Sequence, residues 1–202
     1  MEHKSLLYFV KYPEPGKVKT RLAKDIGPNA AAKAYRGLAE SIFHSLLNHS
    51  SKRKDFETVV FFDPPDKARG IHEWLAGAAA YWPQEGKGLG ERLIHAFEAA
   101  FENGADKVLV LGSDTIGFRE DLITKAFESL DYYDVVIGPA KDGGYYLIGI
   151  KDLHVNLFQN IPWSTSHVLK TTLEWAQEEN LTYYLLPELE DLDEIRISDK
   201  TR

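Results

Sequence analysis

A single carboxylate stands where an apolar stretch of the sequence ends. Residues 108–111 read Val-Leu-Val-Leu, and Gly112 and Ser113 lead from them to Asp114. Branched aliphatic residues without polar alternation are typical of a central parallel strand covered by helices on both faces, and open α/β sheets keep their chemistry at the carboxyl ends of such strands. Because an unpaired carboxylate out of water is costly, Asp114 needs a helix N-terminus, a basic side chain or a metal ion as its partner. The alternative is structural: Asp114 caps a helix that begins near Arg119, or closes a turn.

A basic loop follows the first apolar stretch of the chain. Residues 13–21 read Pro-Glu-Pro-Gly-Lys-Val-Lys-Thr-Arg, which places three cations and one hydroxyl directly after a predicted strand. Glycine lets the backbone approach a ligand closely, and lysine and arginine neutralise phosphate charge. The pattern is neither G-x-G-x-x-G nor a Walker A sequence. The predicted phosphate-binding residues are Pro15, Gly16, Lys17, Lys19, Thr20 and Arg21, and the alternative is a solvated basic loop.

Acidic residues near the end of the chain offer oxygen ligands. Asp191 and Asp193 are two positions apart, so their carboxylates fall on the same side of an extended backbone. Together with Asp114 they would make a hard oxygen site suited to Mg²⁺ or Mn²⁺. The alternative is a solvated acidic segment.

Two glycine-rich loops could line a ligand pocket. Residues 138–144 hold three glycines and one proline around Lys141 and Asp142, and residues 84–92 open onto a predicted helix. Such loops allow close backbone approach to a ligand, whereas a plain turn or a flexible loop is the alternative. Residues 163–165, Trp-Ser-Thr, are either a substrate wall or a helix N-cap. The candidates for the nucleotide are Gln84, Leu89, Gly90, Arg92 and Ser113, and those for the substrate are Asp142, Gly143, Gly144, Tyr145, Trp163 and Thr165.

The composition excludes several classes of function. A formal net charge of −7 argues against a surface built for nucleic acid or anionic lipid. The absence of cysteine excludes disulfides, thiolate metal sites and a cysteine nucleophile. The seven histidines form no i, i+4 pair, and no G-x-S-x-G elbow is present, so neither a histidine zinc site nor a serine hydrolase is supported. The apolar stretch 6–10 is too short for a signal-peptide core, so we expect a cytoplasmic protein without a membrane partner.

The elements that must position these residues alternate between strand and helix. The predicted strands are 5–11, 58–62, 79–82, 108–111, 134–137, 145–150 and 182–186, and the predicted helices are 28–48, 64–76, 91–102, 119–130 and 166–179. The strand 145–150 follows its predecessor too quickly for a helical crossover and is therefore expected to run antiparallel. The sequence predicts an α/β protein with three layers, α/β/α, around a mixed, mainly parallel sheet, in a single domain over residues 1–202.

Taken together, these segments resemble a family of GT-A-like proteins (DUF2064), described as nucleotide-diphospho-sugar transferases or as glycosyltransferases of arsenosugar biosynthesis. The resemblance covers nearly the whole chain and rests on residues 15–22, 89–92, 111–114, 138–149 and 163–165. Its most specific part is the stretch Gly-Pro-Ala-x-Asp-Gly-Gly-Tyr-Tyr at 138–146. More distantly, the layout is similar to the guanylyltransferases that activate phospholactate or molybdenum cofactor.

The resemblance implies a nucleotide over the first strand's loop, with Lys19 and Arg21 on its phosphates and Asp114 on a divalent ion. It also implies Asp193 as a second metal ligand. Two positions depart from the family's pattern: Thr115 and Ile116 stand where it has a small residue and proline, and Glu194 and Ile195 follow Asp193 where it has Thr-Pro.

The leading hypothesis is a metal-dependent glycosyltransferase that uses Mg²⁺ or Mn²⁺, a nucleoside-diphosphate sugar donor and a small-molecule acceptor. Its predicted catalytic residues are Asp114, Lys19, Arg21 and Asp142, the last as the group that orients or deprotonates the acceptor. One alternative is a nucleotidyltransferase in which an acceptor phosphate attacks a nucleoside triphosphate and pyrophosphate leaves. Another is a nucleotide-binding module without catalysis. The sequence does not fix the base, sugar, acceptor or oligomeric state, for which a homodimer is one option.

Overall fold

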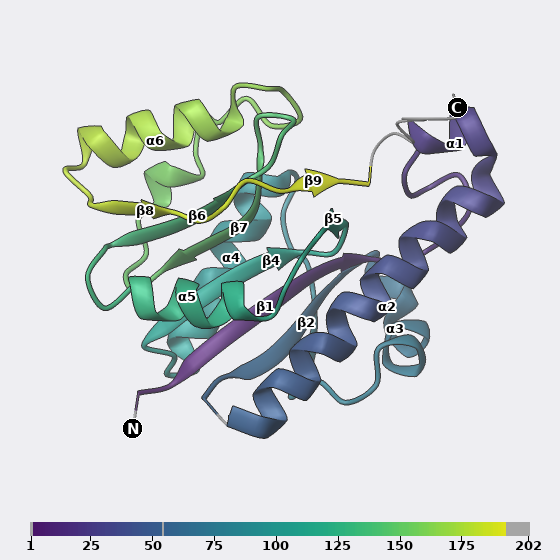
Figure 1. The fold of residues 1–202 in the computed structure, drawn as a ribbon, viewed down its shortest axis with the longest axis horizontal. Coiled ribbons are helices and arrows are strands. Elements are labelled where there is room, and N and C mark those ends of the chain that lie inside the picture. Colours follow the sequence, from purple (N-terminus) through teal and green to yellow (C-terminus); the bar gives the residue numbers. More distant parts are fainter. Residues whose placement is uncertain (1, 54, 193–202) are drawn as a thin grey trace, which may run out of the picture.

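A computed structural model of the chain describes residues 2–53 and 55–192. Its main sheet has seven strands in the order β3-β2-β1-β4-β7-β6-β8, and a second sheet pairs β5 with β9 (Figure 1). The strands are β1 (Lys4–Lys11), β2 (Glu57–Asp63), β3 (Ala80–Pro83), β4 (Lys107–Gly112), β5 (Thr115–Ile116), β6 (Val135–Pro139), β7 (Tyr145–Ile150), β8 (Tyr183–Leu185) and β9 (Glu190–Asp191). The helices are α1 (Leu22–Ile26), α2 (Pro28–Arg53), α3 (Ala68–Trp74), α4 (Leu89–Glu102), α5 (Asp121–Ser129) and α6 (Val168–Glu178), with 3₁₀ turns at Pro65–Lys67 and Val155–Leu157.

The central strands are apolar on both faces, as the uninterrupted aliphatic runs predicted. In β1, Leu6 and Tyr8 join one buried cluster, and Leu7 and Phe9 join the other. Successive side chains of a strand point to opposite faces, so a strand buried on both sides needs apolar residues at every position. The same alternation in β2 and β4 builds a core on each side of the sheet.

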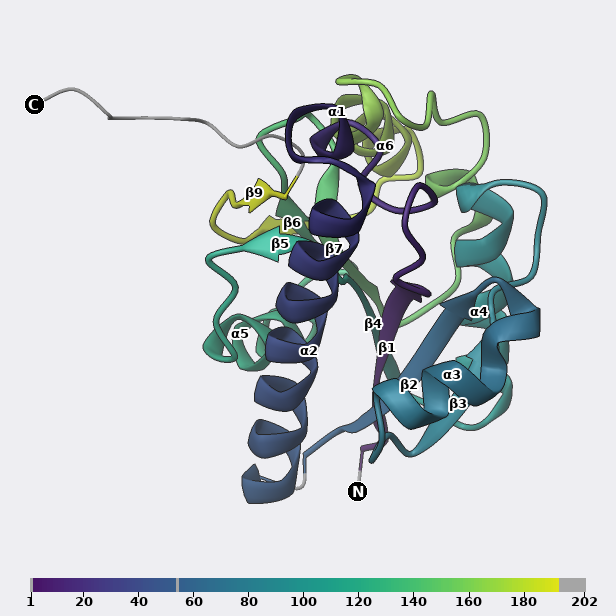
Figure 2. The ribbon, with the colours of Figure 1, turned by 90° about the vertical axis from the view of Figure 1, so that its right-hand side faces the viewer.

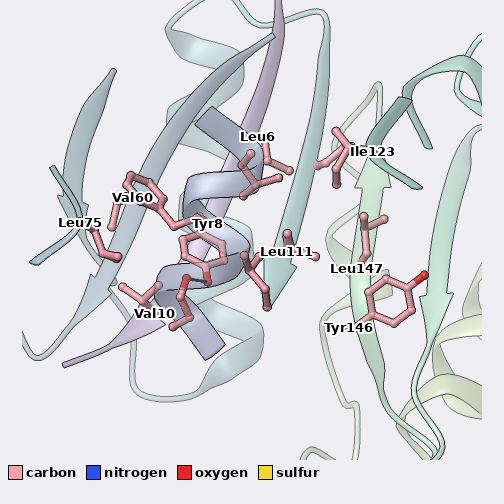
Figure 3. Close-up of a cluster of buried hydrophobic side chains, with 14 of the residues drawn as sticks. Leu6, Tyr8, Val10, Val60, Leu75, Leu111, Ile123, Tyr146 and Leu147 are labelled. Atoms are coloured by element: carbon pink, nitrogen blue, oxygen red, sulfur yellow. Dashed lines mark hydrogen bonds between the residues drawn. The ribbon is translucent and has the colours of Figure 1, made fainter. Parts of the chain in front are cut away.

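Helices cover both faces and complete the three layers. The core on one face is filled by α2, α3 and α5, and the core on the other by α4 and α6. Figure 2 shows α2 and α5 on one side of the sheet and α4 on the other. Figure 3 shows part of the first cluster, in which Leu6, Tyr8 and Val10 of β1 lie on the same face of the sheet as Leu111 of β4, together with Ile123 of α5. The predicted fold class, an α/β protein with a mixed, mainly parallel sheet, is confirmed.

The strand directions bring several loops to one edge of the sheet. Strands β1, β2, β3 and β4 run parallel, whereas β7 is antiparallel to both β4 and β6, as predicted. The carboxyl ends of β1, β4 and β6 therefore lie at the same edge as the amino end of β7. The loops that carry Lys19, Asp114 and Asp142 start from this edge.

Several elements differ from the sequence prediction. Helix α2 continues to Arg53 rather than ending at residue 48, and the short helix α1 was not predicted. Strands β5 and β9 were also missed; they pair antiparallel, with Thr115 opposite Asp191. Two-residue strands leave no periodic signal, so only their partner reveals them. Within the residues that the structure describes, no helix has both the length and the apolar character needed to cross a membrane.

Candidate active site

A cleft of about 730 Å³ lies over the edge of the sheet where β1 and β4 end. One side comes from the loops that follow β1 and β3, namely residues 17–21, Gln84 and Leu89. The other side, across β4, comes from Asp142 in the β6–β7 loop and from the turn 164–166, which lies against Gly143. Residues 112–114 lie between the two sides. The cleft therefore joins segments that are far apart in the sequence, as expected at the carboxyl edge of an open α/β sheet.

Asp114 is paired with the basic loop. The ammonium group of Lys19 donates a hydrogen bond to Asp114 Oδ2, and only 8% of the Lys19 side chain is exposed, against 35% for Asp114. Lys19 has a positive φ of 46°, which is uncommon for a residue with a side chain, and the buried Val18 before it anchors the loop to the core. Of the partners that the sequence allowed for Asp114, the structure shows a basic side chain. Asp114 does not cap α5, whose N-cap is Glu120.

A buried tyrosine fixes the strand ends beneath this ion pair. The Tyr35 hydroxyl accepts a hydrogen bond from Lys11 N at 2.9 Å and lies 2.8 Å from Ser113 Oγ. Burial raises the pKa of Tyr35 to about 12, so the hydroxyl keeps its proton at neutral pH. One side chain of α2 thus connects the end of β1 to the residue before Asp114.

Gln84 and Arg92 form a hydrogen-bonded network with the ends of β1 and β2. The Gln84 amide nitrogen donates to the carbonyl oxygens of Val10 and Phe61 at 3.2 and 3.0 Å. Its oxygen accepts from Arg92 Nη1 at 3.4 Å, and the same nitrogen of Arg92 lies 3.3 Å from Asp63 Oδ1. Both amide hydrogens of Gln84 are used inside the protein. Gln84 lines the cleft, but its donors are not free to read a base.

The opposite wall is a braced turn. Asp142 Oδ1 accepts a hydrogen bond from Gly144 N at 2.8 Å, and Gly143 N donates to Ala140 O at 3.0 Å. Gly143 lies against the next segment, because a Cβ there would come within 2.3 Å of the Ser166 carbonyl oxygen. Leu169 N donates to the Gly143 carbonyl at 2.9 Å. The Asp142 turn and the turn 164–166 are therefore held together.

The structure brings many of the predicted site residues to the cleft. The lining includes Lys17, Lys19, Thr20, Arg21, Gln84, Leu89, Ser113, Asp114, Asp142 and Thr165. Asp193, predicted as a metal ligand, lies outside the described residues. The roles of all these residues remain predictions.

Eight other predicted site residues do not line the cleft, and their contact with a ligand remains a prediction. They are Pro15, Gly16, Gly90, Arg92, Gly143, Gly144, Tyr145 and Trp163. Gly90 is small for a packing reason, since a Cβ there would come within 2.3 Å of the Phe158 carbonyl oxygen. Tyr145 packs edge-on against Trp163 at 6.2 Å between ring centroids, and burial raises the pKa of its hydroxyl. Gly90, Tyr145 and Trp163 are thus engaged in packing contacts.

Sequence reasoning missed part of the lining, namely Phe9, Val10, Lys11, Val18, Tyr35, Gly112 and Ser166, and named Ser164 only within the segment 163–165. A signal existed for Tyr35. Ala31, Ala32, Tyr35 and Ala39 recur at helical spacing and are all buried, so a hydroxyl on this face had to find a polar partner.

The carboxylates offer a limited site for a metal ion. Among the residues that the structure describes, no three His, Cys, Asp or Glu side chains gather as a metal-binding group. As a single carboxylate ligand, Asp114 suits a divalent ion that takes its remaining ligands from phosphates and water, as Mg²⁺ commonly does. The donor set therefore fits a metal that arrives with a phosphate ligand.

Comparison with known proteins gives one family and one group of folds. The model of a family described as "Uncharacterized protein conserved in bacteria (DUF2064)" matches residues 46–165, more than half of the chain. A crystal structure from Desulfovibrio desulfuricans G20, described as a candidate nucleotide-diphospho-sugar transferase, is 36% identical. The match covers 96% of this chain and 84% of that one, with a TM-score of 0.88. No curated protein matches the chain.

Two more distant structures share the fold. Glucosyl-3-phosphoglycerate synthase from Mycobacterium tuberculosis, in complex with Mn²⁺, UDP and glucosyl-3-phosphoglycerate, has a TM-score of 0.57 at 12% identity, over 94% of this chain and 71% of that one. The inositol-1-phosphate CTP transferase from T. maritima has a TM-score of 0.57 at 13% identity, over 99% and 92%. At such identities the likeness shows the fold alone.

Proposed function

The chain belongs to the family of uncharacterized bacterial proteins DUF2064, and from this premise we propose that it is a transferase acting on a nucleotide-activated donor. The finer proposal is a metal-dependent glycosyltransferase that moves a sugar from a nucleoside-diphosphate sugar to a small acceptor. The observation that carries it is the cleft itself, which places the cationic loop 17–21 beside Asp114 at the carboxyl edge of the sheet. The 36% identical structure from Desulfovibrio desulfuricans G20 supports the same assignment.

The cationic side of the cleft suits a diphosphate. Lys17, Lys19 and Arg21 all line it, and three fixed cations match the charge that develops on a nucleoside diphosphate as it leaves. Leu89 is 43% exposed on the same side and offers an apolar surface to the nucleoside. Because these cations already line the cleft, they can neutralise the leaving charge as it develops.

Asp114 would hold the divalent ion together with phosphate oxygens of the donor. When bound, such an ion neutralises charge on the leaving diphosphate. Lys19, which pairs with Asp114 in the structure, would then turn its ammonium group toward a phosphate oxygen.

Asp142 faces the cleft from the other wall and is our candidate for orienting or deprotonating the acceptor. The acceptor hydroxyl attacks the anomeric carbon, and the bond from that carbon to the diphosphate oxygen breaks. The nucleoside diphosphate leaves with the electron pair of that bond, and the hydroxyl proton passes to the carboxylate. Asp142 Oδ1 is engaged by Gly144 N, which fixes the direction of the carboxylate.

The second candidate is nucleotidyl transfer in the same cleft. The three cations would also suit a triphosphate, with an acceptor phosphate attacking the α-phosphorus and pyrophosphate leaving. The two reactions differ in their product, because only the first releases a free nucleoside diphosphate.

A thermal-shift and calorimetric screen of nucleotides and sugar nucleotides, with and without Mn²⁺, tests the proposal. We expect one nucleoside-diphosphate class to stabilise the protein, with binding weakened at least tenfold by Lys19→Ala combined with Arg21→Ala. Lys24→Ala is the matched control, since Lys24 follows in α1 and does not line the cleft. Unchanged nucleotide binding in the double variant would refute the phosphate site. Pyrophosphate released from a nucleoside triphosphate would select the second reaction.

A further inference from the structure

The two walls of the cleft differ in charge. Lys17, Lys19 and Arg21 lie on the wall assigned to the donor. On the facing wall, formed by residue 142 and residues 164–166, the one charged side chain among the described lining residues is Asp142. A ligand that spans the cleft therefore meets cations at one end and a carboxylate at the other.

The Asp142 wall is otherwise made of hydroxyl groups. Thr165 Oγ1 donates to Pro162 O at 2.7 Å and accepts from His167 N at 3.3 Å, so it is used within the turn. Ser164 and Ser166 are exposed and have no hydrogen-bond partner among the residues that the structure describes. The two serine hydroxyls can donate to and accept from the hydroxyls of a ligand, and the second carboxylate oxygen of Asp142 can accept from them.

This wall cannot easily rearrange to bring a cation forward. The contact of Gly143 with the Ser166 backbone and the hydrogen bond from Leu169 N to Gly143 O hold its two turns together. The nearest lysine in sequence, Lys141, is drawn to Glu190 at 3.5 Å and does not line the cleft. The negative charge of Asp142 is thus a fixed property of the wall.

We propose that the acceptor bound against Asp142, Ser164 and Ser166 is an uncharged hydroxyl compound, and that the carboxylate excludes acceptors whose phosphate or carboxylate group would lie there. This inference rests on the proposed function, because it assumes that the donor occupies the cationic wall. It favours glycosyl over nucleotidyl transfer, since the second reaction needs a phosphate of the acceptor beside the donor. Like charges at short distance in a partly enclosed site are a means of rejecting a wrong ligand.

The first test measures anion binding at this wall with the donor wall already filled. Protein saturated with the nucleoside diphosphate found in the screen is titrated with inorganic phosphate by calorimetry. We expect phosphate to bind the native complex at least tenfold more weakly than it binds the Asp142→Lys complex. Asp152→Lys is the matched control: it changes the net charge equally, and Asp152 follows the end of β7 at the opposite edge of the sheet.

Phosphate binding to the native complex that Asp142→Lys does not strengthen would overturn the inference. So would an Asp142→Lys complex that binds phosphate no better than Asp152→Lys, because the carboxylate would then not be what excludes anions. Failure of any nucleoside diphosphate to bind refutes the proposed function instead, so the two failures are distinguishable.

The second test compares acceptors in matched pairs, such as glycerol with glycerol 3-phosphate. With the donor at saturation, we expect transfer by the native protein to favour the uncharged member by about tenfold or more. In Asp142→Lys, which lacks the proposed acceptor base, binding of the two members is compared instead, and we expect the preference to be reversed or removed. Preference of the native protein for the phosphorylated member would contradict the inference even if the donor is used.

Discussion

Strand β4 has a lysine–aspartate pair at each end, and the two pairs differ in what surrounds them. At its start, Lys107 bonds to Asp131 and lies 2.7 Å from Glu2 Oε1. Beyond its far end, Asp114 bonds to Lys19. The lysine is nearly buried in both pairs, with 5% of the Lys107 side chain and 8% of the Lys19 side chain exposed.

The pair at the start of β4 is a closed structural contact. Burial alone would lower the pKa of Lys107, but its hydrogen bonds to Asp131 and Glu2 outweigh this and raise it. The same bonds lower the pKa values of both carboxylates. Two carboxylates therefore neutralise one lysine, whereas the pair at the far end opens onto a cleft that holds further cations. The surroundings of a lysine–aspartate pair, rather than the pair itself, therefore distinguish a structural contact from a candidate functional site.

The largest expected effect comes from breaking the pair at the cleft. We expect Asp114→Asn to lower transfer from the donor by about 100-fold or more, because the carboxylate that would hold the charge-neutralising divalent ion is lost. The midpoint of thermal unfolding should hardly move. Steady-state rates and thermal unfolding measure the two effects, and Asp131→Asn serves as the comparison. Equal losses of rate in both variants would show that the ends of β4 do not differ in function.

The reverse result is expected for Lys107→Met. Removing the ammonium group leaves Asp131 and Glu2 without their partner, and because both carboxylates are partly in water we expect the free energy of unfolding to fall by about 1–3 kcal/mol. Nucleotide affinity should stay within about twofold, since Lys107 lies at the opposite edge of the sheet from the cleft. Urea unfolding and calorimetry give the two quantities. A large loss of nucleotide affinity in a folded Lys107→Met variant would contradict a purely structural role for the pair at the start of β4.

The sequence predicted the far end of β4 better than its start. The aliphatic run 108–111 and the strand-end rule located Asp114, and the antiparallel β7 followed from the short connection before it. The ion pairs of Lys107 were not predicted, because nothing in the sequence around a charged residue at the start of a strand identifies its two partners. Gly90 and Gly143 illustrate the same limit: close approach to the Phe158 and Ser166 backbones and close approach to a ligand both require glycine. Only the tertiary contacts separate the two reasons.

A smaller effect is expected from Asp134, which lies just before β6 at the same edge as Lys107. Hydrogen bonds from Thr182 Oγ1 and N, and then Lys151, lower the pKa of Asp134 to about 2. Since the folded pKa is below the ordinary value of 3.8, the stabilisation is present above about pH 4 and is lost as the pH falls toward 2. We expect Asp134→Asn to lower the free energy of unfolding at pH 7 by about 1–2 kcal/mol and to flatten this acid dependence. Urea unfolding at several pH values compares the native protein with Asp134→Asn. The same dependence of the free energy of unfolding on pH in both proteins would contradict the prediction.

Tyr35→Phe sharpens the comparison at the cleft end with the smallest change. The variant keeps the buried ring but removes the hydroxyl that meets Lys11 N and Ser113 Oγ, so we expect a loss of about 1 kcal/mol in the free energy of unfolding. That is no larger than the loss expected for Lys107→Met, yet nucleotide affinity should fall more, because the hydroxyl fixes the residue next to Asp114. With a pKa of about 12, Tyr35 does not ionise between pH 6 and 9, so the loss should be constant over that range. If Lys107→Met weakened nucleotide binding more than Tyr35→Phe did, the cleft would not be separable from the rest of the sheet.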